Sequence, residues 1–154
     1  MTKPVKKTKS WRKTALVGGL ALVVVFAGIY WYYATEKYGD TKNVKPDYTV
    51  KADEFIREFL DNDSAANKKY TDKIVTVTGT VSEIEAADTT LNIKFIDSTT
   101  GSYAIFAFQQ QHLAETKSVK PGDQVSVKGS CSGGIYSEIL EATAISFKRS
   151  TLSN

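Results

Sequence analysis

The chain has 154 residues, enough for one domain of ordinary size and an appended segment. Hydrophobic residues make up 42% of it and charged residues 24%, a composition that excludes an intrinsically disordered chain. Cys131 is the single cysteine, which excludes an intramolecular disulfide.

The net charge of +3 is distributed unevenly. Residues 1–44 hold eight Lys and Arg against two acids, a net charge of +6, whereas residues 45–154 hold twelve against fifteen, a net charge of −3. The basic character therefore belongs to the N-terminal segment, and the body of the protein is acidic.

Residues 1–13 form a basic tail, and the residues from Thr14 to Ala34 carry no charge. As a helix rising about 1.5 Å per residue, this stretch spans roughly 30 Å, the hydrocarbon thickness of a bilayer. Trp11 lies at one end and an aromatic cluster at 30–33 lies at the other, as expected of side chains at membrane interfaces. The pattern predicts one transmembrane helix over 14–34.

The orientation follows from the flanking charges. Six Lys and Arg precede the apolar run, so the positive-inside rule predicts a single-pass cell-membrane protein with a cytoplasmic N-terminus and an extracytoplasmic body. A cleavable signal peptide has a similar start, but this run is long, ends in bulky aromatics and lacks a small-x-small cleavage site. No cysteine lies directly after the run, which excludes a lipoprotein anchor, and a buried core helix is rarely so long and free of charge.

A polar segment over 35–48, with Gly39 and Pro46, is predicted to be a linker that lifts the next domain off the membrane. From Thr49 onward, Phe55 and Phe59 recur at helical spacing behind an acidic first turn, which predicts a leading helix whose aromatic face packs on the body. A second helical turn is expected over 64–70.

The apolar period then changes to two, which predicts strands over 73–85, 89–97, 102–108, 123–130 and 137–147. The polar segment 109–119 is expected to be a short helix or loop. The order helix, three strands, helical connection and two strands is that of a mostly β, five-stranded oligonucleotide/oligosaccharide-binding (OB) barrel. The expected OB domain covers 49–149, followed by a short tail over 150–154.

Several motifs in this order resemble bacterial membrane-attached domains of the tRNA-anticodon-like OB-fold family. The matching positions are Asn67, Lys69 and Tyr70 in the leading helix, Lys73, Val75, Val77, Thr78, Gly79 and Val81 in the first strand, Gly122, Asp123, Val125, Val127 and Gly129 in the fourth, and Leu140, Ala144 and Ile145 in the last. The resemblance covers about residues 50–147. It implies an OB fold but no tRNA role and no catalytic residue.

A single-strand-binding OB domain needs a basic groove and aromatic platforms. Lys94 is the only base in the second strand and the third has none, while the body is acidic and is expected outside the cytoplasm. The sequence therefore argues against nucleic acid as the main ligand. Phe106 and Phe108 are assigned to the core. The ligand face is predicted on strands two and three and the loops 86–90, 97–101 and 131–136, with candidate residues Asn92, Lys94, Tyr103 and Tyr136.

No catalytic constellation is evident, and no catalytic, metal-binding or cofactor-binding residue is assigned. His112, the only histidine, lies in a polar segment and is expected to be solvated. Cys131 follows a strand and is expected to be a small buried or half-buried thiol rather than a nucleophile. One His and one Cys do not make a metal site at the usual spacings.

The function predicted from the sequence is a membrane-anchored, extracytoplasmic OB-fold binding module of the cell envelope, with an envelope protein or a glycan as partner and no cofactor. The alternative is a single-stranded nucleic-acid-binding OB domain that faces the cytoplasm. A third hypothesis is a small envelope enzyme or stress factor that uses Cys131. The sequence leaves the ligand and the oligomeric state open.

Overall fold

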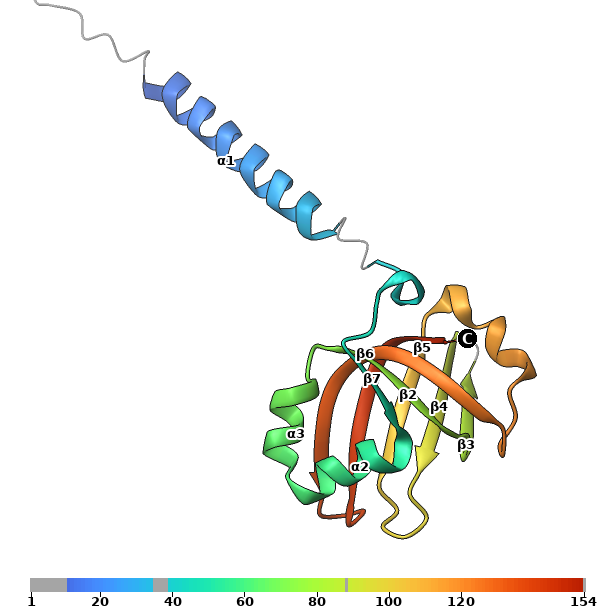
Figure 1. The fold of residues 1–154 in the computed structure, drawn as a ribbon. Coiled ribbons are helices and arrows are strands. Elements are labelled where there is room, and N and C mark those ends of the chain that lie inside the picture. The colour runs from blue at the N-terminus through green and yellow to red at the C-terminus, as the bar shows by residue number, and fades with distance from the viewer. Residues whose placement is uncertain (1–10, 35–38, 88, 154) are drawn as a thin grey trace, which may run out of the picture. The chain divides into compact units, whose positions relative to one another are not determined.

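The computed structural model describes residues 11–34, 39–87 and 89–153, without the side chains of 11–17, 20 and 32–34 (Figure 1). The chain divides into two compact units, Met1–Tyr38 and Gly39–Asn154. The second unit is the body. Most of the predicted basic tail over 1–13 lies outside the described residues.

The first unit contains the helix α1, Trp11–Ala34. Its described apolar side chains, such as Leu22 and Phe26, are exposed. Among the described residues, none of the helices combines the length and apolar character that a bilayer crossing needs. The transmembrane helix predicted over 14–34 is therefore not confirmed and stays a prediction.

The body is mostly β, as predicted. Its elements are η1 (Thr41–Asn43), β1 (Tyr48–Lys51), α2 (Ala52–Asp61), α3 (Asp63–Tyr70), β2 (Ile74–Thr80), β3 (Glu83–Ala87), β4 (Thr90–Ile96), β5 (Tyr103–Phe108), η2 (Gln110–His112), η3 (Glu115–Ser118), β6 (Gln124–Ser137) and β7 (Ala142–Leu152). The predicted helical connection over 109–119 is confirmed as the two 3₁₀ turns η2 and η3.

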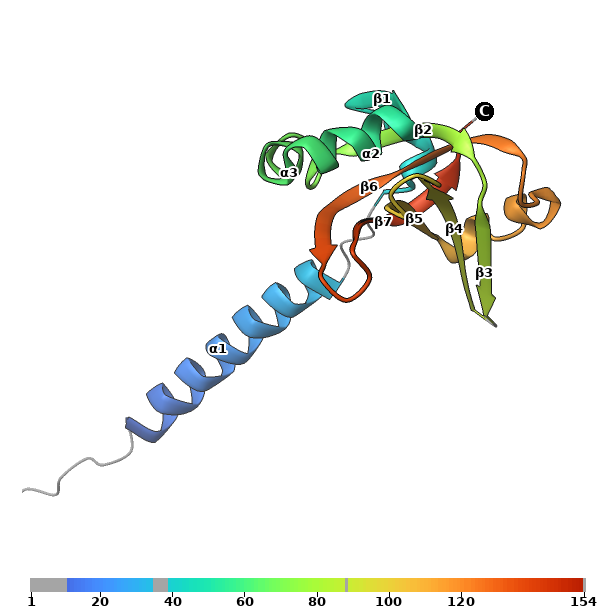
Figure 2. The ribbon, with the colours of Figure 1, turned by 90° about the horizontal axis from the view of Figure 1, so that it is seen from below.

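The predicted leading helix is present as α2, and the second helical turn expected over 64–70 is present as the helix α3. The two helices cover one side of the sheet (Figures 1 and 2). Asp53 and Glu54 lie in the first turn of α2, where carboxylates stabilise a helix N-terminus. Asn62 separates the helices because its backbone is extended (φ −158°), and its side chain caps α3 by accepting a hydrogen bond from the Ala65 N–H (2.9 Å).

The sheet has seven strands in the order β1-β2-β6-β7-β5-β4-β3. The β1–β2 and β5–β7 pairs are parallel and the others are antiparallel. The sheet is open, with β1 and β3 at its edges, so the prediction of a five-stranded barrel was wrong in its number of strands, and the sheet does not close. An OB-like order of strands remains.

The first predicted strand, 73–85, is broken because the chain changes partners. β2 pairs with β6, whereas β3 pairs with β4. At the break, the Val81 N–H bonds to the Asp123 carbonyl and the Ser82 N–H to the Lys94 carbonyl (both 2.9 Å). β1 is a strand that was not predicted. It spans the boundary that was expected between the linker and the OB domain, at 48/49.

The predicted loop over 131–136 was wrong, because these residues continue β6 and the chain turns only after Ser137. Gly133 and Gly134, which were expected to form a bend, instead leave room for side chains of the helices to pack closely on β6. A Cβ on Gly134 would lie 2.6 Å from Phe59 Cδ1, and one on Gly133 would lie 2.6 Å from Asn67 Oδ1. Gly133 also has φ +101° at a β-bulge, a conformation that favours glycine.

The core lies between the helices and the inner face of the sheet. The ring of Phe55 is 4.9 Å from that of Tyr70, and the ring of Phe106 is 4.4 Å from that of Phe147, between centroids. Phe106 and Phe108 are both buried, which confirms their assignment to the core. Burying one such side chain contributes about 1.5–3 kcal/mol.

Part of the predicted linker over 35–48 is packed against the body. Residues 35–38 lie outside the described part, but Thr41 is buried and the Asp47 N–H bonds to the Ile74 carbonyl (2.7 Å). The body therefore begins at Gly39 in the structure, and residues 39–47 belong to it.

Candidate ligand-binding face

The side of β3, β4 and β5 that points away from the core forms one continuous surface, which we call the outer face. Strand register sets its membership: Glu83 lies opposite Lys94, Lys94 opposite Ile105, and Ile96 opposite Tyr103. Residues directly opposite each other in a ladder share a face. The outer face consists of Glu83, Glu85, Ala87, Thr90, Asn92, Lys94, Ile96, Tyr103, Ile105 and Ala107.

Lys94 is at the centre of the polar contacts of this face. Its Nζ lies 3.3 Å from Glu83 Oε2, contacts Glu85 Oε1, and sits 5.4 Å from the centre of the Tyr103 ring. Asn92 donates a long hydrogen bond of 3.5 Å to Glu85. The Lys94 side chain is only 16% exposed, so the two carboxylates and the ring enclose most of it.

These contacts shift the ionisation of the pair in opposite directions. The hydrogen bond from Lys94, and secondarily that from Asn92, lowers the pKa of Glu85. The Glu85 contact in turn raises the pKa of Lys94, against a smaller opposing effect of burial. Both groups are therefore charged at neutral pH. The face carries two Glu and one Lys, a net charge of −1.

The structure brings together three of the four predicted ligand residues. Asn92, Lys94 and Tyr103 share the outer face, but Tyr136 does not. Tyr136 pairs with Thr143 and lines a surface pocket beside Phe59 and Leu60, on the helix side of the sheet. The bulge at Gly133 changes the alternation of β6 just before Tyr136, and a count by twos along the sequence misses that change.

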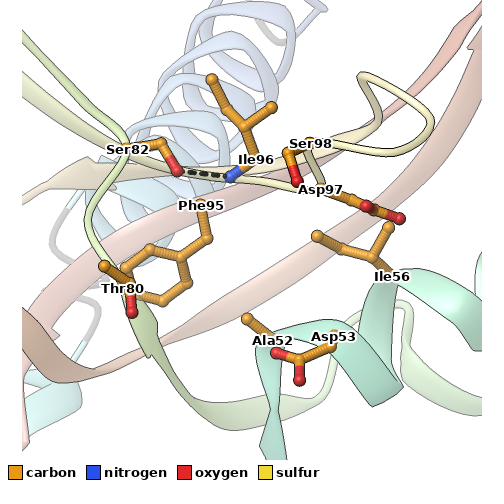
Figure 3. Close-up of a pocket in the computed structure, with 9 residues that line it drawn as sticks. All are labelled: Ala52, Asp53, Ile56, Thr80, Ser82, Phe95, Ile96, Asp97 and Ser98. Carbon is orange, nitrogen blue, oxygen red and sulfur yellow. Dashed lines mark hydrogen bonds between the residues drawn. The ribbon is translucent and has the colours of Figure 1, made fainter. Parts of the chain in front are cut away.

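A pocket of about 270 Å³ lies between α2 and the ends of β2 and β4 (Figure 3). Ile56 and Phe95 contribute apolar side chains to its lining, and Asp53 on α2 and Asp97 after β4 contribute acidic ones. Asp97 is already engaged, since it accepts hydrogen bonds from the Thr99 N–H (2.8 Å) and the Thr100 hydroxyl (3.2 Å), which lower its pKa. The sequence did not indicate this pocket, because α2 and β4 are distant along the chain.

The polar groups of this pocket offer no nucleophile–base pair. The Ser82 hydroxyl oxygen accepts a hydrogen bond from the Ile96 N–H (3.0 Å), which holds the start of β3 against the end of β4 (Figure 3). Neither His nor Lys is among the lining residues. The two aspartates make the pocket acidic, and Ile96 belongs both to its lining and to the outer face.

The two residues with potential chemistry lie elsewhere. Cys131 is buried in the core as expected, and burial raises the pKa of its thiol to about 11. The expectation that His112 is solvated was wrong: its side chain is 7% exposed because its ring contacts Asp40 and Glu115. Within the described residues, no hydrogen bond joins Cys131 to His112, and no group of three His, Cys, Asp or Glu side chains is arranged to hold a metal ion.

An open, mostly antiparallel sheet, a helical layer and an exposed face on β3–β5 define a small OB-like domain of the binding type. The chain belongs to the tRNA_anti-like family, whose model matches residues 2–141. The match confirms the resemblance over residues 50–141 and extends it toward the N-terminus, but it does not cover residues 142–147.

The fold is similar to that of a Klebsiella pneumoniae protein provisionally described as a nucleic acid-binding lipoprotein. The TM-score is 0.54 at 15% identity, over 68% of this chain and 91% of that one. At this identity the likeness concerns the fold alone. No curated protein matches the sequence.

Two aminoacyl-tRNA synthetases give weaker matches. One is a provisionally assigned aspartyl-tRNA synthetase from Leishmania major (TM-score 0.45, 12% identity, 77% of this chain and 22% of that one). The other is the asparaginyl-tRNA synthetase of Entamoeba histolytica (TM-score 0.43, 14% identity, 70% of this chain and 24% of that one).

Proposed function

We propose that the protein is a binding module of the cell envelope, anchored by the segment 14–34, whose outer face holds a neutral or cationic extended segment of a partner protein. The observation that carries the proposal is the neutralisation of Lys94 by Glu83 and Glu85 beside the Tyr103 ring. The face therefore offers apolar and aromatic surface together with an excess of negative charge. The proposal assigns no catalytic role.

The charge balance argues against a phosphate backbone as the ligand. A single strand held on an OB face requires Lys and Arg along its path, and its affinity comes largely from the release of counterions. Lys94 is the only cation on the outer face, and a phosphate would have to displace two carboxylates from it. A peptide that carries Lys or Arg meets those carboxylates favourably.

The position of β3 supports an extended partner. β3 is an edge strand, so the backbone groups on its outer side have no strand partner in the sheet. Adding a strand to such an edge is a recurrent mode of peptide recognition, in which backbone hydrogen bonds supply affinity and side chains on the neighbouring face supply specificity. Glu83 and Glu85 project from this strand at the place where the side chains of an added strand would lie.

Membrane attachment is the second part of the proposal. It is supported by the uncharged run 14–34 between a basic tail and an aromatic cluster, and the positive-inside rule then places the body outside the cytoplasm. A reporter that is active only outside the cytoplasm, fused to Asn154, tests this orientation, with a cytoplasm-only reporter in parallel. Activity of the cytoplasmic reporter alone would contradict it.

Photo-crosslinking in the cells from which the chain comes tests the binding face. A photoreactive residue in place of Ile105, on the outer face, is expected to give a discrete protein adduct. The same residue in place of Glu54, which is exposed on α2, is the matched control and should give none. Equal labelling from both positions would contradict the proposed face, and an adduct that nuclease removes would establish the nucleic-acid alternative.

A further inference from the structure

Residues 40–44, which we call the strap, lie at the start of the body and are held by side chains from three other parts of the fold. η1 lies within the strap and is closed by hydrogen bonds from the Asn43 N–H to the Asp40 carbonyl (3.0 Å) and from the Val44 N–H to the Thr41 carbonyl (3.2 Å). The Thr41 side chain is buried beneath it. The strap is therefore docked on the body rather than solvated.

One attachment comes from β6. The Lys128 ammonium group is buried and donates hydrogen bonds to the carbonyls of Lys42 (2.7 Å) and Val44 (2.9 Å). No carboxylate among the described residues forms an ion pair with it. A buried lysine held by two carbonyls of the strap loses both partners if the strap leaves, so docking and lysine burial are coupled.

The other attachment is His112 at the end of η2. Its Nε2 lies 2.7 Å from Asp40 Oδ1, on the strap, and its Nδ1 lies 3.3 Å from Glu115 Oε1, on η3. Lys42, also on the strap, contacts the same Glu115 oxygen. Thr151, from β7, donates a long hydrogen bond of 3.5 Å to the other oxygen of Glu115. A carboxylate thus faces each nitrogen of the ring.

This geometry makes the contact of His112 with Asp40 and Glu115 depend on whether the imidazole ring is protonated. An imidazolium ring donates from both nitrogens, whereas a neutral ring has one N–H and turns a lone pair toward the second carboxylate. The hydrogen bond from His112 is the largest of the effects that lower the pKa of Asp40, and Lys42 followed by His112 lowers the pKa of Glu115. Both acids therefore stay ionised across the range in which histidine ordinarily titrates.

We propose that His112 is a proton-sensitive latch: its protonated ring fastens the strap to the body through Asp40, and loss of the proton loosens the strap. Residues 35–38 alone separate α1 from the body while the strap is docked. Release would add residues 39–46 to that connection. The latch would then regulate the length of the tether, whether or not α1 crosses a membrane.

Amide hydrogen exchange of the strap in the full-length protein in detergent micelles tests the latch. The amides of Lys42, Asn43 and Val44 report directly, because each donates a hydrogen bond within the strap. Their protection factors, corrected for intrinsic exchange, are expected to fall about tenfold between about pH 5.5 and about pH 8. Val77 in the buried sheet should keep its protection throughout and so report the global fold.

Two variants assign the effect to the latch. H112Q should give weak strap protection at both pH values, since glutamine does not titrate. D40N should reduce the pH dependence, because it removes the charge that the imidazolium meets while leaving the core untouched. K148Q, which removes a distant exposed partner of Asp72, is the matched control and should behave as wild type.

Strap protection that is the same at both pH values in the wild type would overturn the proposal, as would a pH dependence that persists unchanged in H112Q. If H112Q does not fold, D40N provides the test. A D40N protein whose strap protection keeps the full wild-type pH dependence also overturns the proposed latch.

Discussion

At the scale of single residues, the roles of Gly134 and Lys94 depend on contacts with residues that are distant in the sequence or on a neighbouring strand. Gly134 is a strand residue without a positive φ, and its requirement for glycine comes from Phe59 on the helix above it. Lys94 appears basic in the sequence, but the structure places it between Glu83 and Glu85 so that it adds no free positive charge.

Substituting Gly134→Ala is expected to destabilise the body by about 1–3 kcal/mol, since the new Cβ would lie 2.6 Å from Phe59 Cδ1 in a packed core. Chemical denaturation followed by circular dichroism measures this change. Gly39→Ala is the control: its Cβ would enter open space, and its effect should stay within about 0.5 kcal/mol. Equal effects of the two substitutions would refute the close packing of α2 on β6.

Replacing Lys94 with Gln is expected to raise the pKa of Glu85 toward its ordinary value, because the hydrogen bond from Lys94 is the main cause of its lowering. In the wild type, a lowered carboxyl pKa stabilises the fold above the pKa of the unfolded chain, and this contribution is lost as the pH falls through the folded value. K94Q should therefore lose less stability on acidification than the wild type. NMR titration of the Glu85 carboxyl checks the shift, and an unchanged pKa would contradict the contact.

At the scale of elements, the points where one helix or strand ends and the next begins determine which surfaces the body exposes. The extended backbone at Asn62 ends α2 just before α3 begins, which lets both helices place aromatic side chains on the sheet. The change of partner at 81–82 turns one predicted strand into β2 and β3, which creates the free edge used in the proposed recognition.

Substituting Asn62→Ala is expected to cost about 0.5–2 kcal/mol, because the Ala65 N–H at the start of α3 loses its capping oxygen. Asn62→Asp retains a capping oxygen and should stay near the wild type. Thermal or denaturant unfolding of the two variants measures the difference. If alanine and aspartate were equally tolerated, the cap would contribute nothing to the stability of α3.

At the scale of the whole molecule, the body starts earlier than its sequence suggests. Residues 39–48 supply the strap, the Asp47 contact to β2 and the Tyr48 ring, which packs 5.1 Å from Tyr70. A boundary at 48/49 would remove all of them and cut β1 after its first residue.

A fragment of residues 39–154 is expected to fold alone, because it contains the whole core, whereas a fragment of residues 49–154 should be less stable by roughly 2–4 kcal/mol. The loss reflects Tyr48 and the first pairing of β1 with β2. Urea denaturation of both fragments measures the difference. Equal midpoints would mean that residues 39–48 contribute nothing to the fold of the body.

The sequence by itself determined the features that depend on local periodicity. Residues 14–34 are an uncharged run whatever surrounds them, the face of α2 follows from Phe55 and Phe59 four residues apart, and the alternation in β4 and β5 already separates Phe106 from the outward side chains. These patterns predicted the mostly β class, and the resemblance of the motifs, not the periodicity, predicted the family.

The tertiary structure alone decided what depends on contacts between distant segments. His112 is buried against Asp40, which lies 72 residues away in the sequence, and the orientation of Tyr136 depends on a bulge at Gly133. The open sheet results from β2 and β3 choosing different partners. The physical reason is common to all three: local sequence sets the direction of a side chain only up to the next irregularity, and long-range packing sets which irregularities form.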